Sequence, residues 1–461
     1  MTRQILVALA VAACAAPAFA QSAVDGGAPL GDGGTASGVD EAEIARALQA
    51  DTAAAAKKQA ASSAAAAAAA NSPSTPGAPQ ASAGFGPALG RMFQSLNPDV
   101  SAIVDFAAGW FSDDQGTIKA GDDPQSTGFK IQEVELALQA VVDPYFRADI
   151  FLTIPNLSGI EVEEAFLTTT HLPWNLQIKA GIFRAGLGRQ NAQHLHLQDF
   201  TRRPLLNTEL LGVDGLRSPG LEINWLVPNL PFYLVLAYSM FTVDPAEANE
   251  PLQTFGGGQR WDFTYLATAR AFFPLSDTMS LYAGLNYAHG KTSQSVTAND
   301  VVPSTASGNT AYDNYYDNLY GADLYFKWKP VNQARSYASV AWQSEYFLRQ
   351  IPDLVLGGFK RPQLEGGLYS QVVVQAHRRW FIGLRGEIMG LPSGDSIHRE
   401  YAGDASLTWQ LSEFARIRIY GEVRYGQRFL PLDPTPRSPR LSEAAFLQLE
   451  AAIGAHGAHP F

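Results

Sequence analysis

Strict alternation of apolar and polar residues over segments of about ten residues is the feature that most constrains this fold. In one such segment, Ala415, Ile417, Ile419, Val423 and Tyr425 alternate with Arg416, Arg418, Tyr420, Glu422 and Arg424. Soluble sandwiches alternate too, but their strands average about five or six residues and their apolar face points to a core. A sheet that separates lipid from water needs long strands with charges on one face. The pattern therefore predicts a membrane-spanning barrel.

About sixteen segments of this kind follow one another, which sets the size of the barrel. They begin near Ser101, Gly128, Pro144, Gly159, Trp174, Pro219, Pro231, Arg260, Thr278, Asn318, Arg335, Leu364, Arg379, Tyr401, Phe414 and Ala444. The connections alternate between short turns, such as residues 171–174, and long polar loops, such as residues 290–317. Bacterial outer-membrane barrels have short inner turns and long outer loops. We therefore predict an all-β, transmembrane, antiparallel up-and-down barrel of about 16 strands over residues 100–461.

Composition agrees with a barrel and excludes several other classes of protein. Charged residues make up 17% of the chain, against about 25% in average globular proteins. Tryptophans such as Trp174, Trp380 and Trp409 stand near predicted strand ends, where aromatic belts meet the membrane interface. No run of about 18 apolar residues follows the N-terminus, so transmembrane helices are not expected. The net charge of −11 argues against a nucleic-acid partner.

The first hundred residues predict export followed by a low-complexity extension. Residues 1–20 have Arg3, an apolar run and Ala18-Phe19-Ala20, as in a cleaved signal peptide. Cleavage before Cys14 as a lipoprotein is an alternative. Residues 21–84 are rich in alanine and proline, which predicts a helical or disordered periplasmic extension. Residues 85–99 carry apolar side chains at helical spacing and predict a short amphipathic helix.

The polar stretch at residues 186–218 is the candidate site, because a structureless segment this long is usually functional or disordered. We predict that it folds into the channel and narrows it, although an ordinary surface loop is the alternative. Its candidate constriction residues are Arg189, His194, His196, Asp199, Arg202 and Arg203. Alternation also predicts inward-facing charges on the pore wall, namely Arg147, Asp149, Lys179, Lys327, Arg385, Arg416, Arg418 and Arg424.

Several segments resemble the phosphate-selective porin O and P family. They are LNPDVSAIVDFAAG (residues 96–109), FKIQEVELALQAVVDPYFRADIFL (129–152) and LQIKAGIFRAGLGRQN (176–191), followed by HLHLQDF and RRPL. The resemblance implies a sixteen-stranded trimeric outer-membrane channel whose third external loop, here residues 186–218, constricts the pore. This chain departs from the arginine and lysine ladders of anion-selective members, since its inward charges are mixed. Glu133, Glu135, Glu161 and Glu163 add negative charge near the second and fourth strands, so phosphate selectivity is not expected.

Motifs of catalysis are absent from the sequence. We find no Gly-rich phosphate loop, HExxH or GxSxG pattern, so no enzyme activity or cofactor is expected. His194 and His196 with Asp199, or His456 with His459, offer fewer ligands than the three or four that zinc usually takes, so no metal is expected.

The predicted function is an outer-membrane porin for passive diffusion of small polar or ionic solutes. Its expected partners are outer-membrane lipid, those solutes, two further copies in a homotrimer, and the barrel-assembly machinery. The last contact is expected through the C-terminal strand ending in Phe461. The alternatives are a specific substrate or metal-ion uptake channel, and a structural barrel that tethers the envelope.

Overall fold

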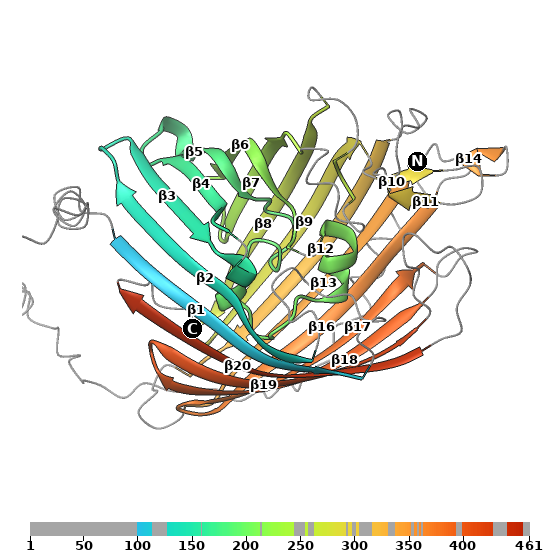
Figure 1. Ribbon diagram of the computed structural model, residues 1–461. Coiled ribbons are helices and arrows are strands. Elements are labelled where there is room, and N and C mark those ends of the chain that lie inside the picture. Colours follow the sequence, from blue (N-terminus) through green and yellow to red (C-terminus); the bar gives the residue numbers. More distant parts are fainter. Residues whose placement is uncertain are drawn as a thin grey trace, which may run out of the picture. The chain divides into compact units, whose positions relative to one another are not determined.

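The computed structural model describes residues 99–112, 127–157, 159–212, 214–243, 254–256, 262–291, 294–296, 301–303, 316–330, 337–351, 355–356, 359–360, 363–392, 399–426 and 440–454 (Figure 1). The predicted signal peptide, the extension and the helix up to residue 98 lie outside these residues. The same holds for Cys14, His456, His459 and Phe461. Asp99, the last residue of the predicted helix, is the first residue of strand β1.

Sixteen antiparallel strands form one closed barrel in which every strand pairs with its neighbours along the chain. They are β1 (Asp99–Phe111), β2 (Gly128–Val141), β3 (Phe146–Thr153), β4 (Glu161–Thr169), β5 (Leu176–Arg184), β6 (Arg217–Leu226), β7 (Tyr233–Phe241), β8 (Thr264–Ser276), β9 (Met279–Lys291), β12 (Tyr316–Trp328), β13 (Ser339–Ile351), β16 (Gln363–His377), β17 (Trp380–Leu391), β18 (Glu400–Ser412), β19 (Ala415–Gly426) and β20 (Arg440–Gly454). This confirms the predicted all-β, up-and-down barrel and its strand number.

Short elements lie in the connections between the barrel strands. The strand pairs β10 (Gln294–Val296) with β11 (Val301–Pro303), and β14 (Val355–Leu356) with β15 (Phe359–Lys360), form two small separate sheets. Three 3₁₀ turns, η1 (Pro155–Leu157), η2 (Pro173–Asn175) and η3 (Leu195–Leu197), and one α-helix, α4 (Leu205–Leu211), complete the described structure. Within the described residues, no helix is long and apolar enough to cross a membrane.

The first and last strands close the sheet. Strand β1 pairs with β20 from Ser101 opposite Gly454 to Phe111 opposite Ala444. An open strand edge in lipid would leave unpaired backbone groups, each of which costs several kcal/mol. Closure therefore removes the edge that a membrane could not tolerate.

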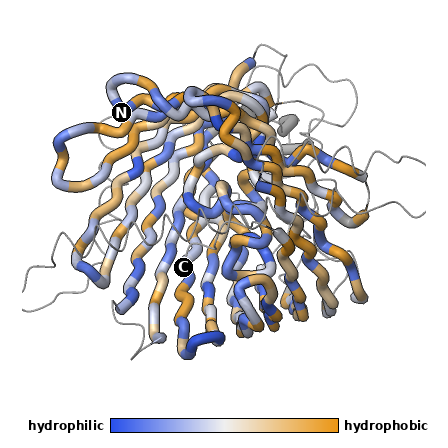
Figure 2. The backbone as a smooth tube through the Cα atoms, turned by 90° about the vertical axis from the view of Figure 1, so that its left-hand side faces the viewer, coloured by the Kyte–Doolittle hydropathy of each residue, from blue (hydrophilic) through white to orange (hydrophobic). Residues whose placement is uncertain are grey.

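The strands turn apolar side chains outward and polar side chains inward. On β19, Ile419 and Val423 are exposed, whereas Arg418 and Glu422 on the opposite face are buried. Figure 2 shows hydrophobic and hydrophilic residues alternating along the strands in this way. A soluble protein rarely exposes a contiguous apolar surface of more than a few hundred square ångströms. This exterior is therefore suited to lipid.

Aromatic side chains gather at the rim with the short turns. Tyr145, Trp174 and Phe414 are exposed beside the turns that follow β2, β4 and β18. The rings of Trp380 and Trp409, from neighbouring strands, stack with centroids 5.6 Å apart. Such a belt anchors a barrel at the boundary between lipid and water.

Candidate functional site

The chain between β5 and β6 turns into the barrel and contacts strands on several sides of it (Figure 1). We call this segment, residues 185–216, the inner loop. Its leucines pack in one hydrophobic cluster with side chains of distant strands. The cluster includes Leu187, Leu205, Leu206 and Leu210 of the inner loop with Phe241 of β7, Phe347 of β13, Tyr369 of β16 and Met389 of β17. Apolar burial thus fixes the inner loop against the barrel wall.

Asn191 holds the two ends of the inner loop together. Its side-chain nitrogen donates to the carbonyl oxygens of Ala185 at 2.7 Å and Leu216 at 2.9 Å. The N–H of Leu216 donates back to Asn191 Oδ1 at 2.8 Å. The N–H of Ala185 also donates to the carbonyl of Leu216 at 2.9 Å. These bonds continue the β5–β6 ladder for one more step. Asn191 was not among the residues predicted from the sequence. The one feature that pointed to it is its position at the end of residues 176–191, a segment that resembles the porin family.

Two buried glutamates on the wall accept backbone N–H groups of the inner loop. Glu345 of β13 accepts from Arg189 at 2.8 Å and from Gln190 at 2.7 Å. Glu387 of β17 accepts from Leu205 at 2.5 Å, at the start of α4. These bonds give buried wall carboxyl groups and backbone N–H groups of the inner loop the partners that buried polar groups need. Glu345 was not among the predicted residues. It is 155 positions or more from Gln190 and Arg189 in the chain, and only the path of the inner loop brings them together.

Wall arginines donate to backbone carbonyls of the inner loop. Arg385 Nη1 donates to the carbonyl of Arg202 at 3.0 Å, and Arg418 Nη2 donates to that of Gln198 at 2.8 Å. Arg416 donates to the carbonyl of His196. These three arginines face inward as predicted. Arg385 and Arg418 are almost fully buried beneath the inner loop.

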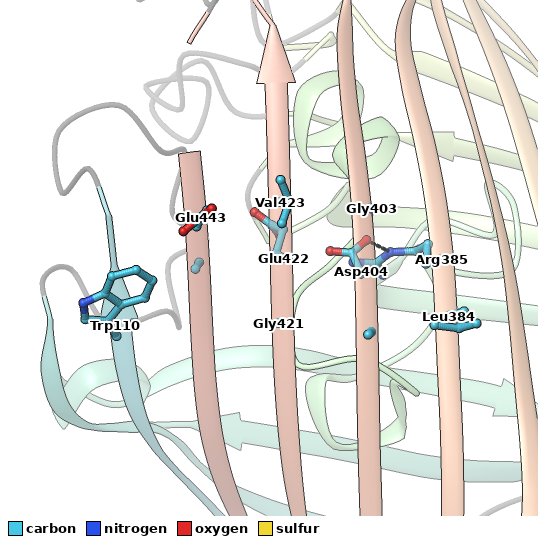
Figure 3. Close-up of a pocket in the computed structure, with 11 residues that line it drawn as sticks. Trp110, Leu384, Arg385, Gly403, Asp404, Gly421, Glu422, Val423 and Glu443 are labelled. Atoms are coloured by element: carbon cyan, nitrogen blue, oxygen red, sulfur yellow. Dashed lines mark hydrogen bonds and ion pairs between the residues drawn. The ribbon is translucent and has the colours of Figure 1, made fainter. Parts of the chain in front are cut away.

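Ion pairs continue this network along β17, β18 and β19. Arg202 Nη1 of the inner loop lies 2.7 Å from Glu422 Oε1, and both side chains are buried. Glu422 also pairs with Arg424 and accepts a hydrogen bond of 2.8 Å from the Tyr420 hydroxyl. Arg385 Nε lies 2.8 Å from Asp404, the contact marked in Figure 3. Arg202, Arg385 and Arg424 therefore each have a carboxylate partner. Arg418 instead donates to Thr408, Gln448 and the carbonyl of Gln198.

The predicted site residues thus fall into a buried group and an accessible group. The buried group consists of His194, His196, Arg202, Arg203, Asp149, Arg385, Arg418 and Arg424. Asp149 differs from the others, because its partners are Arg147 and Gln139 on the wall. The accessible group consists of the exposed Asp199 and Arg147 with the partly exposed Arg189, Lys179, Lys327 and Arg416. Arg189 places its guanidinium carbon 4.1 Å from the centre of the Tyr325 ring. Lys327 interacts electrostatically with Arg189, Asp199 and Lys329.

A hollow of about 530 Å³ lies on the inner face near the short-turn rim. Lys179, Glu222, Arg270, Gln177 and Asn224 contribute polar groups to its lining. Lys179 Nζ lies 3.7 Å from Glu222. The accessible charges on the inner face are therefore of both signs, as the sequence predicted.

His194 lies in a buried cluster of carboxylates from β2 and β4. Its Nδ1 is 3.2 Å from Glu135 Oε2 and 3.2 Å from Glu163 Oε2, and its Nε2 is 2.7 Å from Glu164 Oε2. Burial alone would lower the pKa of His194. The charge of Glu163 and the hydrogen bonds to Glu135 and Glu164 outweigh burial and hold this pKa well above its ordinary value. Sequence reasoning considered His194 with loop residues alone and did not join it to the glutamates noted on the second and fourth strands.

Comparison with known proteins gives one sequence relative and a set of barrels. No family model matches the chain. An "Uncharacterized protein" of Aquifex aeolicus (strain VF5) is 30% identical over 401 residues, which cover 79% of this chain and 80% of that protein. An anion-selective porin from Comamonas acidovorans superposes with a TM-score of 0.50 at 10% identity, covering 77% of this chain and 99% of the porin. The outer membrane channel DcaP of Acinetobacter baumannii gives 0.48 at 10% identity, with 77% and 97% covered. At such identity the likeness to the Comamonas acidovorans porin shows a porin-like fold and nothing further.

Proposed function

Because the chain belongs to one family with the Aquifex aeolicus protein and folds as a closed sixteen-stranded barrel, we propose that it is an outer-membrane channel. Small polar or ionic solutes diffuse through it passively, and the inner loop constricts the pore. The observation that carries this proposal is the inner loop itself, tied to Glu345, Glu387 and Glu422 on the inside of the wall. A purely structural barrel has no need of a polar segment fixed across its interior.

The inner loop sieves solutes by size, and the accessible charges act on those that fit. Ion selectivity in pores comes from the width of the passage and from charged side chains that line it. The buried arginines Arg385 and Arg424 are neutralised by carboxylate partners and contribute little field to the passage. Asp199 and Arg189 on the inner loop and Lys327 on the wall are in contact with water. These three residues steer ions in the proposed mechanism.

We do not extend the resemblance with phosphate-selective porins to phosphate itself. A ladder of unpaired cations would be needed to select that anion over others. Here several accessible cations are paired with carboxylates, as Lys179 is with Glu222 at 3.7 Å and Arg147 is with Asp149 at 2.8 Å. The proposed solute class is therefore small polar or ionic molecules of either sign.

Purified protein in planar lipid bilayers tests the channel directly. We expect the conductance to rise in steps. Each step corresponds to the insertion of one open barrel or of one oligomer of barrels. The matched control is the same preparation after heat unfolding in detergent, which should give no steps. Folded protein that inserts into the bilayer without conducting would contradict the proposed function.

We also propose a homotrimer, in keeping with the resemblance, and place its contact on the outer face of β17 to β20. There a hollow of about 530 Å³ is lined by Trp110, Leu384 and Val423 around Gly403 and Gly421 (Figure 3). A Cβ atom added at Gly403 or Gly421 would meet nothing within 4 Å. A large side chain there is therefore compatible with the single barrel.

Replacing Gly403 by phenylalanine should shift the protein from trimer to monomer, because the ring fills the hollow that the neighbour would occupy. Light scattering in detergent measures the mass of the assembly. Leu285→Phe, at an exposed position of β9, is the control and should leave the mass unchanged. An unchanged mass for Gly403→Phe would place the contact elsewhere or remove the trimer.

A further inference from the structure

The cluster around His194 joins the inner loop to β2 and β4 through side chains that are all metal ligands in other proteins. His194 and His196 come from the inner loop, Glu135 from β2, and Glu163 and Glu164 from β4. All five side chains are at most 9% exposed. Imidazole with carboxylate and without thiolate is a ligand set for divalent first-row metals such as Zn²⁺. We propose that Glu135, Glu163 and His194 bind one such ion, with His196 beside the Glu135 ligand.

The distances between the candidate ligand atoms fit a tetrahedral ion. One atom each from Glu135, Glu163 and His194 lie within 4.8 Å of one another. His194 Nδ1 is 3.2 Å from an oxygen of Glu135 and from one of Glu163, and His196 Nδ1 is 3.2 Å from that Glu135 oxygen. Bonds of about 2.0 Å in a tetrahedron separate the ligand atoms by about 3.3 Å. Charge-assisted hydrogen bonds are shorter, about 2.7 to 2.9 Å.

The surroundings of His194 and Glu163 leave one ligand atom of each directed to the shared space. His194 Nε2 lies 2.7 Å from Glu164 Oε2, so an ion that displaces the proton of Nδ1 would find Nδ1 as the ligand while Nε2 keeps its proton. Metal-bound histidines almost always have such a carboxylate or carbonyl partner on the other nitrogen. Arg184 Nε and Nη2 hold Oε1 of Glu163. Oε2 of Glu163, which is the oxygen 3.2 Å from His194 Nδ1, is buried and accepts no hydrogen bond from the described residues.

The charges of the cluster favour a divalent cation. Glu135, Glu163 and Glu164 carry three negative charges, and Arg184 supplies one positive charge. Two negative charges remain, and buried charges without compensation cost several kcal/mol each. Protons on both His194 and His196 would cancel them, and an ion of charge two cancels them while both imidazole rings stay neutral. The ion would also fasten the inner loop to β2 and β4, away from its anchors Glu345 and Glu422.

Zinc binding to the full chain in detergent tests the proposal. The protein, carrying a tag without histidine, is stripped with a chelator and titrated with Zn²⁺ by calorimetry. We expect about one ion per chain, and an X-ray absorption spectrum with nitrogen and oxygen at about 2.0 Å. Glu135→Gln and His194→Gln should lose this binding. Glu164→Gln, which touches the ion only through His194, should weaken it about 10- to 100-fold.

Glu222→Gln is the matched control, because Glu222 is a buried inner-face carboxylate on β6 with no histidine beside it. It should bind zinc like the unmodified protein. Gel migration before and after heating reports whether each variant has a folded barrel. Absence of zinc uptake by the folded, unmodified protein would overturn the proposal. Equal affinity and number of ions in Glu135→Gln would overturn it as well. Neither outcome bears on conduction, which is measured separately in bilayers.

Discussion

Replacing Arg202 and Arg203 together by glutamate is expected to release the inner loop from the wall and raise the single-channel conductance. Arg202 pairs with Glu422 at 2.7 Å, and both side chains are buried. Removing one partner of a buried ion pair costs about 3 to 5 kcal/mol. The new carboxylate would also repel Glu422. Arg203 donates to the carbonyl of Gln193 at 3.3 Å inside the same loop, so the double change weakens both the docking and the internal structure of the loop.

Single-channel recordings in symmetrical salt measure this change. The exposed pair Arg378 and Arg379, in the turn between β16 and β17, offers a control with the same residues and the same change of charge. Its replacement by glutamate should leave the step size close to that of the unmodified protein. If the step size and the ion preference of the Arg202 and Arg203 variant were also unchanged, the inner loop would not border the pore.

Replacing Lys327 and Lys329 by glutamate is expected to shift ion preference toward cations. Both side chains are partly exposed, and Lys327 interacts electrostatically with Arg189 and Asp199 of the inner loop. The change replaces two accessible positive charges by two negative ones, of which the one at Lys327 lies near the inner loop. The reversal potential in a salt gradient measures the result. A shift of a few tens of millivolts is expected, within the limit of about 59 mV for a tenfold gradient of a single monovalent ion.

Comparing this shift with that of a second charge-reversed pair tells whether the region near the inner loop sets the ion preference. The Arg378 and Arg379 control lies at the rim and should move the reversal potential less. Salt should reduce both shifts, because the Debye length falls to about 3 Å at 1 M. A larger shift from the rim pair than from the lysine pair would move the selective region away from the inner loop.

Most of the barrel could be predicted from the sequence, because lipid on one side and water on the other force a local pattern. The predicted strand at Gly128 begins there, and the one predicted at Arg335 begins at Ser339. The facing of Arg418 and Glu422 on β19 also followed from alternation alone. The alternation of apolar and polar residues is a local pattern, so it can be recognised from residues that are neighbours in the sequence.

The site was predictable only as a list of residue types in one long segment. Whether Arg189 contacts water or Arg202 is buried depends on where the inner loop meets the wall, and those partners are far away in the chain. Arg202 and Glu422 are 220 positions apart, and His194 and Glu135 are 59 apart. No local pattern encodes such pairs. The glutamates on β2 and β4 were visible as negative charge, but their meeting with His194 was not.

The hydrogen bonds between Ala185, Asn191 and Leu216 bring the ends of the inner loop to adjacent rungs of the β5–β6 ladder. The inner loop, about thirty residues long, therefore connects β5 and β6 at the position where a tight hairpin turn would otherwise join them. Such an insert can be exchanged for a shorter or longer one without disturbing strand register. In the proposed channel, a different insert at this position would therefore change the width of the passage while the barrel around it stays the same.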